Sequence, residues 1–346
     1  MDLPDISSLD LKEKRVLLRA DLDVDPSADD SLRLDVLKPT VDQIFEKGAT
    51  CVILLGHMGR PKGEDKSMSL SLVRPEVERI LGKEVFFIDS WDFSFITERI
   101  KESSNQKLFL LENLRFHPGE EANDDTFSKY LSLLGDAYIN EAFADSHRKH
   151  ASIVGIPKFL THAYGSRFLA EIEHLSKIFI NPERPVVSVI SGLKEDKLNY
   201  IERFSGFSDK ILIGGRLPLY VEEKFSGIKD IGGGEKVIVA DLTADKEDIT
   251  IHSIEKFENE INKAKTVLLS GPLGKFEDQG HRLGTQRIFA SIINSKTFKV
   301  AGGGDTEKAI SLLGMVQGFN WISVGGGAML EYLADKTLAG IEALKT

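Results

Sequence analysis

Short apolar runs alternate with amphipathic segments along the whole chain. In the second half, five such runs each end at glycine: VVSVISG, DKILIGG, TVLLSG, FKVAGGG and NWISVGGG. In the first half, the runs RVLLRADLDV, TCVILLGHMGR, KLFLLENLRF and DAYINEAF lead instead into Asp, His and Arg. A short apolar run that stops at a turn signal is typical of a strand buried in a parallel sheet. The alternation with helical segments predicts an α/β fold.

Amphipathic segments fill the intervals between these runs. Apolar residues recur at helical spacing in the segments 36–48, 72–83 and 124–135. The segment 164–182 is predicted to be a long amphipathic helix that ends at Pro182 and Pro185. It lies where the chemistry at the strand ends changes, so we interpret it as the helix that connects two domains.

The residues that follow the strands predict what the two halves bind. In open parallel sheets, ligands gather outside the carboxyl ends of the strands. One half lines that edge with cationic and polar side chains, and the other lines it with backbone N–H groups, the usual cradle for phosphate. Two halves that each suit an anion indicate group transfer between two phosphorylated ligands.

Bulk composition limits the class of protein. The chain has 346 residues, 41% of them hydrophobic and 28% charged, which is ordinary for a soluble protein of two domains. No apolar run is long enough to cross a bilayer, and the N-terminus lacks a secretion signal. The one cysteine of the chain, Cys51, lies in an apolar run, so we expect it to be a buried strand residue. A single cysteine cannot form an internal disulfide, which fits a reducing compartment. The net charge of −10 argues against nucleic-acid binding. We expect a cytoplasmic monomer with small-molecule substrates and no membrane partner.

Eight strings carry the most specific chemistry, and their order along the chain is informative. They are RADLDV at 19–24, GHMGRP at 56–61, ENLRFHPGEE at 112–121, NEAFADSHRKHAS at 140–152, SGLKEDK at 191–197, SGPLGKFE at 270–277, GGGDT at 302–306 and SVGGGAMLE at 323–331. Together the strings resemble the phosphoglycerate kinase family over essentially the whole chain. The resemblance implies two Rossmann-like three-layer domains whose parallel sheets face each other across a hinged cleft. Residues 1–163 would bind phosphoglycerate and 183–332 the nucleotide, with 333–346 packing back on the first domain.

The resemblance also implies the substrate site. Four arginines and a histidine match the family: Arg33, Arg60, Arg115, Arg148 and His57. Arginine suits this task because its planar guanidinium binds phosphate and carboxylate oxygens bidentately and keeps its charge. Asp21 would orient a substrate hydroxyl, and the remaining substrate-binding positions are Leu22, Asp23, Met58 and Gly59. The alternative is that the arginines form ordinary surface ion pairs.

His147 and His150 flank Arg148 at a spacing that could suit a metal. No carboxylate or cysteine joins them at metal-site spacing, so a loop or packing role is favoured.

On the nucleotide side, the resemblance implies Lys194, Lys197, Gly214, Gly215, Pro272, Glu277, Gly303, Gly304, Asp305 and Thr306. The two lysines follow a strand and a glycine and should share one face of a first helical turn. Asp305 is the predicted ligand of Mg²⁺, which would arrive as MgADP or MgATP. The alternatives are a solvated charge cluster for the lysines and plain tight turns for the glycines. The chain has neither GxxxxGK[ST] nor GxGxxG, so a P-loop enzyme and a nicotinamide-dependent dehydrogenase are both disfavoured.

The implied reaction is reversible phosphoryl transfer between 1,3-bisphosphoglycerate and MgADP, giving 3-phosphoglycerate and MgATP. Catalysis would consist of positioning and charge neutralisation by Arg33, Lys194, Gly303 and Gly326. The alternative is a catalytically impaired relative that binds one ligand in a regulatory or assembly role.

The chain departs from the family pattern in several places. Asp23 replaces asparagine and should weaken substrate binding unless an arginine pairs with it. Lys194 and Lys197 are one residue closer together than the family pattern has them. The string NEAFADS stands where the family has NDAFGTA, with Glu141 and Asp145 as notable changes, and Ser270 and Val324 replace asparagine and threonine. Several tens of residues are absent between 213–215 and 248–254, a region in which the family builds part of the adenine pocket.

Overall fold

The computed structural model describes residues 3–25, 32–102, 108–232 and 234–345. The chain divides into two compact units, one of Met1–Glu171 with Thr337–Thr346 and the other of Ile172–Lys336. Each unit is built on one six-stranded sheet, and every pair of neighbouring strands is parallel. The predicted α/β class with two parallel sheets is confirmed. None of the helices in the described ranges has the length and apolar character needed to cross a membrane.

The sheet of the first unit has the strand order β3-β4-β2-β1-β5-β6. Its strands, in that order, are Phe86–Ile88, Leu108–Leu111, Cys51–Leu55, Arg15–Arg19, Ala137–Asn140 and His162–Tyr164. The central strand β1 pairs with β2 on one side and with β5 on the other. Four of its five residues are buried, because helices cover both faces of the sheet and no solvent face needs polar residues.

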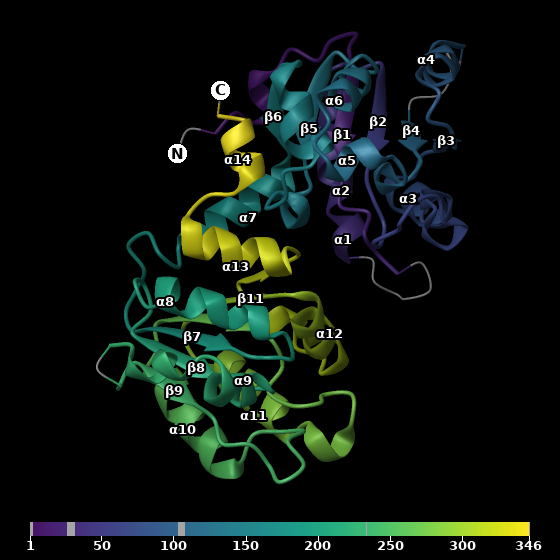
Figure 1. Ribbon diagram of the computed structural model, residues 1–346. Coiled ribbons are helices and arrows are strands. Elements are labelled where there is room, and N and C mark those ends of the chain that lie inside the picture. The colour runs from purple at the N-terminus through teal and green to yellow at the C-terminus, as the bar shows by residue number, and fades with distance from the viewer. Residues whose placement is uncertain (1–2, 26–31, 103–107, 233, 346) are drawn as a thin grey trace. The chain divides into compact units, whose positions relative to one another are not determined.

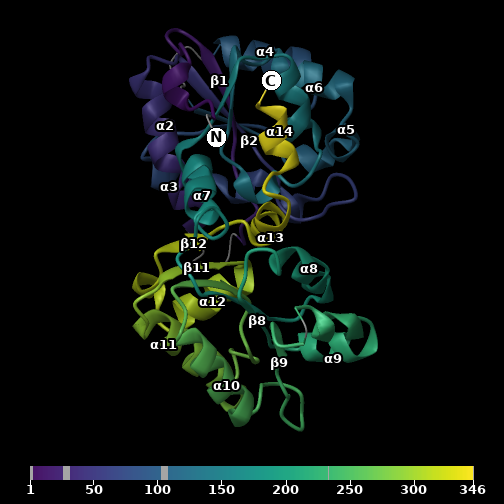
Figure 2. The ribbon, with the colours of Figure 1, turned by 90° about the vertical axis from the view of Figure 1, so that its left-hand side faces the viewer.

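Helices cover this sheet on both faces. Figure 2 shows α2 (Leu37–Glu46) and α3 (Arg74–Leu81) on one side, and α5 (Pro118–Glu121), α6 (Asp125–Ser132) and α14 (Ala339–Ala343) on the other. The short α1 (Leu32–Asp35) precedes α2, and α4 (Phe93–Glu102) joins β3 to β4.

The C-terminal helix α14, yellow in Figure 1, packs on the first unit. Gly340 N donates to Ser146 O at 2.8 Å, and the Tyr164 hydroxyl donates to Ile341 O at 2.8 Å.

The sheet of the second unit has the strand order β12-β11-β10-β7-β8-β9. In that order the strands are Trp321–Ser323, Phe298–Gly302, Thr266–Ser270, Val186–Ile190, Lys210–Ile213 and Val237–Val239. Figure 2 shows α8 (Ile201–Phe204) and α9 (Leu217–Glu223) on one side, and α10 (Ile251–Ile261), α11 (Leu283–Asn294) and α12 (Gly304–Leu312) on the other. Helix α13 (Gly326–Asp335) packs beside α8.

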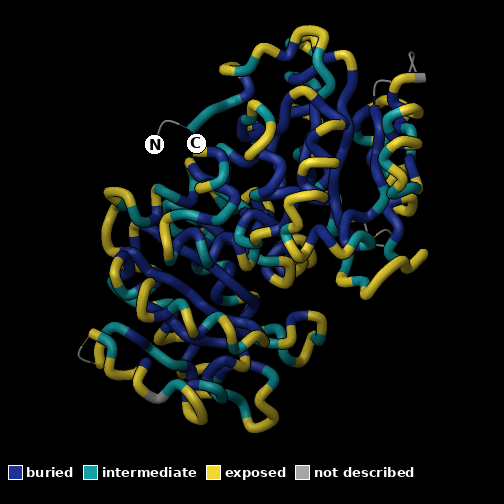
Figure 3. Tube along the Cα trace, turned by 45° about the horizontal axis from the view of Figure 1, so that its top comes forward, coloured by how far each residue is buried: buried dark blue, intermediate teal, exposed yellow. Residues whose placement is uncertain are grey.

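The apolar core of each unit lies between its sheet and its helices. The strands β2, β4, β5, β7 and β10 are buried along their whole length, and in Figure 3 such buried segments are dark blue while exposed positions are yellow. In the first unit, Leu18, Val41 and Val77 belong to one buried cluster that joins β1, α2 and α3. In the second, Phe257 and Phe289 join α10 and α11 over the sheet. Burial of these side chains leaves the strand ends free to carry polar groups.

The predicted connecting helix is shorter than the sequence indicated. Helix α7 spans Ser166–Ser176 and does not reach Pro182. After Ser176 the chain tightens into turns, with Phe179 N donating to Ser176 O, and Asn181 adopts a left-handed backbone with φ of 50°. Proline restricts the backbone of the residue before it, Asn181, but the helix has already ended in the turns that follow Ser176.

Candidate functional site

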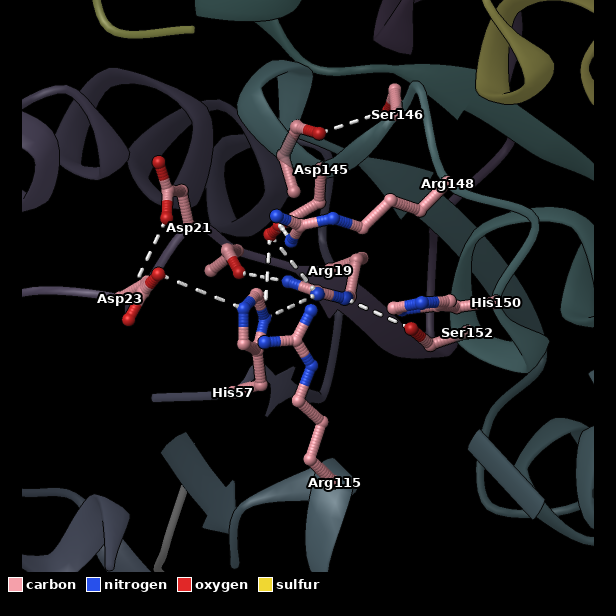
Figure 4. Close-up of polar contacts among 12 residues, drawn as sticks. Arg19, Asp21, Asp23, His57, Arg115, Asp145, Ser146, Arg148, His150 and Ser152 are labelled. Carbon is pink, nitrogen blue, oxygen red and sulfur yellow. Dashed lines mark hydrogen bonds and ion pairs between the residues drawn. The ribbon is translucent and has the colours of Figure 1, made fainter. Parts of the chain in front are cut away.

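Arg19 lies at the carboxyl end of β1 and is the centre of a buried polar cluster (Figure 4). Its side chain is fully buried, and Nε donates to Ser152 Oγ at 2.9 Å. Nη2 contacts Asp145 Oδ2 at 3.1 Å and His57 Nδ1 at 3.0 Å. Because β1, β2 and β5 are neighbouring parallel strands, the segments after them meet at one edge of the sheet. The sequence therefore brings these residues together through the sheet topology.

Asp145 provides the buried carboxylate of this cluster. Arg148 Nη1 donates to Asp145 Oδ1 at 2.8 Å, and His57 Nδ1 lies 3.4 Å from Oδ2. Burial opposes ionisation of Asp145, but the surrounding cations, Arg19, Arg148 and Arg115 among them, hold its pKa well below the usual range. Asp145 is therefore an anion that contacts cationic side chains in the folded protein.

His57 is buried and neutral. Burial lowers the pKa of His57, and the charges of Arg19 and Arg115 add to this shift while Asp145 opposes it. Since Arg19 Nη2 donates to Nδ1, the imidazole proton is assigned to Nε2. Nε2 is buried and has no hydrogen-bond partner, and its nearest carboxylate oxygen, Asp23 Oδ2, is 3.8 Å away. His57 thus presents an unused donor.

The predicted residues Asp21, Asp23 and Arg33 lie next to this cluster. Arg33 Nη1 is 3.5 Å from Asp21 Oδ2 and donates to Asp23 O at 3.2 Å. Gly59 N donates to Asp23 Oδ1 at 2.8 Å, so the backbone of the 56–61 loop holds this carboxylate. Burial raises the pKa of Asp21 to about 6, although Arg33 opposes the shift.

The other predicted substrate residues have different surroundings. Arg115 Nη1 donates to Gly59 O at 2.5 Å, and its Nε is 3.2 Å from Glu121 Oε1. Arg60 is exposed on the same loop. Leu22 and Met58 are buried apolar side chains that belong to the core of the first unit.

Buried polar atoms without a hydrogen-bond partner gather in this region. Five of the ten such atoms in the described residues lie here: Asp21 Oδ2, His57 Nε2, Arg115 Nε, His147 Nδ1 and His150 Nδ1. Two of the five also have an ion-pair partner, since Arg115 Nε is 3.2 Å from Glu121 Oε1 and Asp21 Oδ2 is 3.5 Å from Arg33 Nη1. Such atoms are costly in a folded protein unless water or a ligand satisfies them. Their concentration beside three guanidinium groups marks the carboxyl edge of the first sheet as a candidate anion site.

In the second unit, the strand ends form glycine turns. Gly303, with φ of +107°, precedes α12, and Gly325 precedes α13. The first intrahelical bond of α12 is donated by Glu307 N to Gly303 O, so the preceding N–H groups lie at the helix N-terminus. A Cβ on Gly326 would lie 3.0 Å from Gly303 Cα. The two helix N-termini are therefore adjacent, and together they form an arrangement of donors suited to phosphate.

Thr306 and Gly271 tie these turns together. The Thr306 hydroxyl donates to Gly302 O at 2.9 Å and accepts from Gly271 N at 2.8 Å. A Cβ on Gly271 would lie 2.0 Å from Ser191 O, so only glycine fits. Thr306 is one of the residues that the resemblance implies for nucleotide binding, and its hydroxyl is bonded inside the unit. Its backbone N–H, in the first turn of α12, is the group that could contact a phosphate.

The sequence predicted that Lys194 and Lys197 share one face of a first helical turn. In the structure they do not share one face of an α-helical turn. Lys194 is exposed and precedes a 3-10 helix, Glu195–Tyr200. The Lys197 ammonium instead turns inward and donates to Ser191 O at 2.7 Å and Ser270 O at 3.1 Å. Burial lowers the pKa of Lys197 to about 8, with Asp305 opposing the shift.

The remaining predicted nucleotide residues line the ends of β8 and β10. A Cβ on Gly214 would lie 2.4 Å from Leu273 Cδ1, and Gly215 has φ of +60°. Pro272 O accepts a hydrogen bond from Ser191 Oγ at 2.6 Å. Glu277 is exposed on a loop, and its carbonyl oxygen accepts from Arg282 Nη2 at 3.1 Å.

Sequence reasoning missed two members of the cluster. Arg19 stood in a quoted string but was not selected, because it ends an apolar strand and reads as part of it. Glu120 is fully buried, and its carboxylate accepts from Ser152 N at 3.0 Å and from Ser152 Oγ at 2.6 Å. A charged residue at the end of an otherwise apolar strand was the available signal for Arg19.

Comparisons with known proteins agree with this geometry. The family model described as "Phosphoglycerate kinase" matches residues 6–229 and 217–336. A phosphoglycerate kinase from Finegoldia magna is 35% identical over 394 residues, covering 99% of each chain. One from Dictyoglomus turgidum is 34% identical over 388 residues, covering 99% of this chain and 98% of the relative.

Solved structures are also similar. Phosphoglycerate kinase from Pyrococcus horikoshii OT3 has a TM-score of 0.86 and 26% identity, and the one from Coxiella burnetii has a TM-score of 0.82 and 25% identity. Each comparison covers 99% of this chain and 98% of the other.

The predicted shortening of the chain is visible in these alignments. The 394 aligned positions exceed the 346 residues of the chain, so the relative has segments that this chain lacks. The two family matches overlap at 217–229, inside the region in which residues were expected to be absent. Matches of this extent settle the assignment. The chain belongs to the phosphoglycerate kinase family, whose members are phosphotransferase enzymes of glycolysis.

Proposed function

We propose that the chain catalyses reversible transfer of a phosphoryl group between 1,3-bisphosphoglycerate and MgADP, giving 3-phosphoglycerate and MgATP. The observation that carries the proposal is the set of unsatisfied buried polar atoms beside Arg19, Arg115 and Arg148 at the edge of the first sheet. Membership of the family supplies the ligand class for that site.

The first unit would bind the three-carbon acid. Arg33, Arg115 and Arg148 present guanidinium groups that suit phosphate and carboxylate oxygens. The Nε2–H of His57 is buried and unused, so it would donate to the same ligand. His57 is not proposed as a proton acceptor, because its lowered pKa leaves it a weak base.

The second unit would bind the nucleotide. Gly214 and Gly215 would let the base lie against backbone, and Glu277 would bind the ribose. The N-termini of α12 and α13 would accept the phosphates, with Lys194 free to reach them.

A magnesium ion that arrives with the nucleotide needs only one or two protein carboxylates. Asp305 fits this requirement, because it is an exposed carboxylate in the first turn of α12, beside the glycine turns. Asp305 would hold the ion. The bound ion supplies neutralisation of phosphate charge.

The transfer step needs no general base. In the direction of ATP consumption, a carboxylate oxygen of 3-phosphoglycerate attacks the γ-phosphorus, and the bond to the β–γ bridging oxygen breaks. ADP leaves with the electron pair, and no proton moves because the acid is already ionised. Arg33, Lys194 and the N–H groups at Gly303 and Gly326 would stabilise charge on the moving group. Because transfer is direct, the acid and the nucleotide must be in contact when the phosphoryl group moves.

A second candidate is a relative that binds phosphoglycerate without turnover. Asp145 and Asp23 add negative charge to the acid site, and this charge opposes the binding of an anionic substrate.

One assay separates the two candidates. Purified full-length chain is mixed with 1,3-bisphosphoglycerate and MgADP, and ATP formation is followed. The proposal predicts ATP formation that depends on both substrates. Binding of 3-phosphoglycerate without any ATP formation would favour the second candidate. The monomeric state and cytoplasmic location expected from the sequence are part of the same proposal, and gel filtration tests the first.

A further inference from the structure

Asp145 accepts hydrogen bonds from two guanidinium groups at the acid site, those of Arg19 and Arg148. Its two carboxylate oxygens contact Arg19 Nη2 at 3.1 Å and Arg148 Nη1 at 2.8 Å, and Oδ2 is 3.4 Å from His57 Nδ1. In Figure 4 the three side chains converge on this carboxylate. The Asp145 side chain is 5% exposed, so water screens these contacts little.

The two guanidinium groups depend on Asp145 to different degrees. Arg19 also donates to Ser152 Oγ and to Ala20 O, so its position is held by other bonds as well. Arg148 is 27% exposed, and Asp145 is the acceptor that directs it into the cluster. Removing the negative charge would leave Arg19 in place and release Arg148 toward a ligand.

We propose that Asp145 is an internal counter-anion that sets how much negative charge the acid site accepts, and so lowers its affinity for multiply charged acids. This inference rests on the proposed function for the identity of the ligand. Two like charges in one partly desolvated pocket repel strongly, because the effective dielectric there is far below that of water. The penalty grows with the charge of the ligand.

The alternative role for Asp145 is to compensate the buried charge of Arg19 and nothing more. That role predicts that loss of the carboxylate destabilises the fold and leaves ligand affinity unchanged or weaker. Only the proposed role therefore predicts a lower dissociation constant for the variant.

The test uses Asp145→Asn, which keeps an oxygen acceptor for Arg19 and removes the charge. Titration calorimetry would give dissociation constants of the full chain for 3-phosphoglycerate and for glycerate, which lacks the phosphate. The proposal predicts binding of 3-phosphoglycerate tighter by roughly tenfold or more, and a smaller gain for glycerate. Unchanged or weaker binding of 3-phosphoglycerate would overturn it.

Asp136→Asn is the matched control. Asp136 accepts two hydrogen bonds from the Arg15 side chain, at 3.0 and 2.7 Å, and one from Arg15 N at 2.9 Å, so the same substitution alters another Arg–Asp pair. Arg15 lies at the opposite end of β1 from Arg19, away from the acid site. The control should leave both dissociation constants unchanged.

Further measurements keep the inference separate from the proposed function. If the wild type and Asp145→Asn both fail to bind 3-phosphoglycerate, the proposed ligand is wrong. In that case the dissociation constant for inorganic pyrophosphate tests the inference, which predicts that Asp145→Asn binds pyrophosphate more tightly than the wild type does. If Asp145→Asn does not fold, Asp145→Ser replaces it. If neither variant folds, the dissociation constants of the wild type for glycerate and for 3-phosphoglycerate decide. The proposal predicts that the charged phosphate adds little affinity, so 3-phosphoglycerate binding more than about a hundredfold tighter than glycerate would overturn it.

Discussion

The ammonium group of Lys197 lies 2.7 Å from the carbonyl oxygen of Ser191, between the ends of β7 and β10. The same group donates to the carbonyl and hydroxyl oxygens of Ser270 at 3.1 and 3.2 Å. A lysine expected to contact phosphate therefore also ties together two strand ends. Lys194, three residues earlier, is exposed and has no such internal bonds among the contacts described.

The two lysines are predicted to respond differently to substitution. Lys197→Met should lower the free energy of unfolding by about 1–3 kcal/mol, because three buried oxygens lose their donor. Lys194→Met should leave stability unchanged and reduce kcat strongly. Urea unfolding and steady-state kinetics on both variants would check this. Equal stability of the two variants would contradict the structural role of Lys197.

Arg33 is predicted to act in the transfer step rather than in nucleotide binding. Arg33→Ala should lower kcat by several orders of magnitude, because the guanidinium would neutralise charge on the moving phosphoryl group. The dissociation constant for MgADP should stay near that of the wild type. Arg74→Ala is the control, since Arg74 is an exposed residue of α3 that pairs with Glu78 at 3.6 Å. Near-wild-type turnover of Arg33→Ala would refute the assignment.

Glu141 is predicted to stabilise the start of α7. Its carboxylate accepts from Arg167 N at 3.1 Å, from Phe168 N at 3.0 Å and from the Thr40 hydroxyl. Glu141→Ala would leave these buried donors without an acceptor and should lower the free energy of unfolding by about 2–4 kcal/mol. Urea unfolding at neutral pH measures this, with the exposed Glu46→Ala as control.

The pH dependence of Glu141 follows from its environment. Burial raises the pKa of Glu141 from 4.5 to about 7, although Thr40 and two backbone donors oppose the shift. Because the pKa of Glu141 is higher in the folded state than in the unfolded state, the folded state binds more protons between these two values. The stability that Glu141 contributes is therefore present below about pH 4.5 and is lost as the pH rises to about 7. Glu141→Ala should therefore cost more stability at pH 4.5 than at pH 7, and an opposite trend would contradict the account.

His281 is predicted to hold the loop that carries Glu277. Its two ring nitrogens lie 2.9 Å from Asp278 Oδ2 and 2.9 Å from Asp245 Oδ2. Asp278 and Asp245 raise the pKa of His281, while the other charged groups near this bridge are Asp248 and Lys275. The bridge is complete below the ordinary histidine pKa of 6.5 and is lost as pH rises through the raised value, because neutral imidazole has one donor.

Affinity for MgADP should accordingly weaken as the pH rises through that raised pKa. His281→Gln should weaken binding at low pH and flatten this dependence. His252→Gln, an exposed histidine on α10, is the control. A pH profile that is the same in wild type and His281→Gln would contradict the role of the bridge.

The strands and the anion-binding edges could be predicted from the sequence because they depend on local patterns. The run RVLLRADLDV predicted β1 with its polar end, and GGGDT predicted the turn before α12. The role of Asp145 could not be predicted in this way. Its contacts with Arg19 and His57 join segments that are far apart in the chain and meet only through the strand order of the sheet.

The directions of side chains could not be predicted from the sequence either. Spacing placed Lys194 and Lys197 on a common face, but Lys194 precedes the 3-10 helix with an extended backbone, and the carbonyl groups of two strand ends hold the Lys197 ammonium inside the unit. The length of α7 was overestimated because an amphipathic pattern continues through turns that are not helical.

The central claim is transfer of a phosphoryl group to the carboxylate of 3-phosphoglycerate. Full-length chain would be incubated with ATP labelled at the γ-phosphoryl group, Mg²⁺ and 3-phosphoglycerate, and hydroxylamine would trap the acyl phosphate as a hydroxamate. The account predicts label leaving ATP and hydroxamate forming in equal amounts, both abolished in Arg33→Ala. No hydroxamate from the folded wild-type chain, with 3-phosphoglycerate and MgATP both shown to bind, would contradict it.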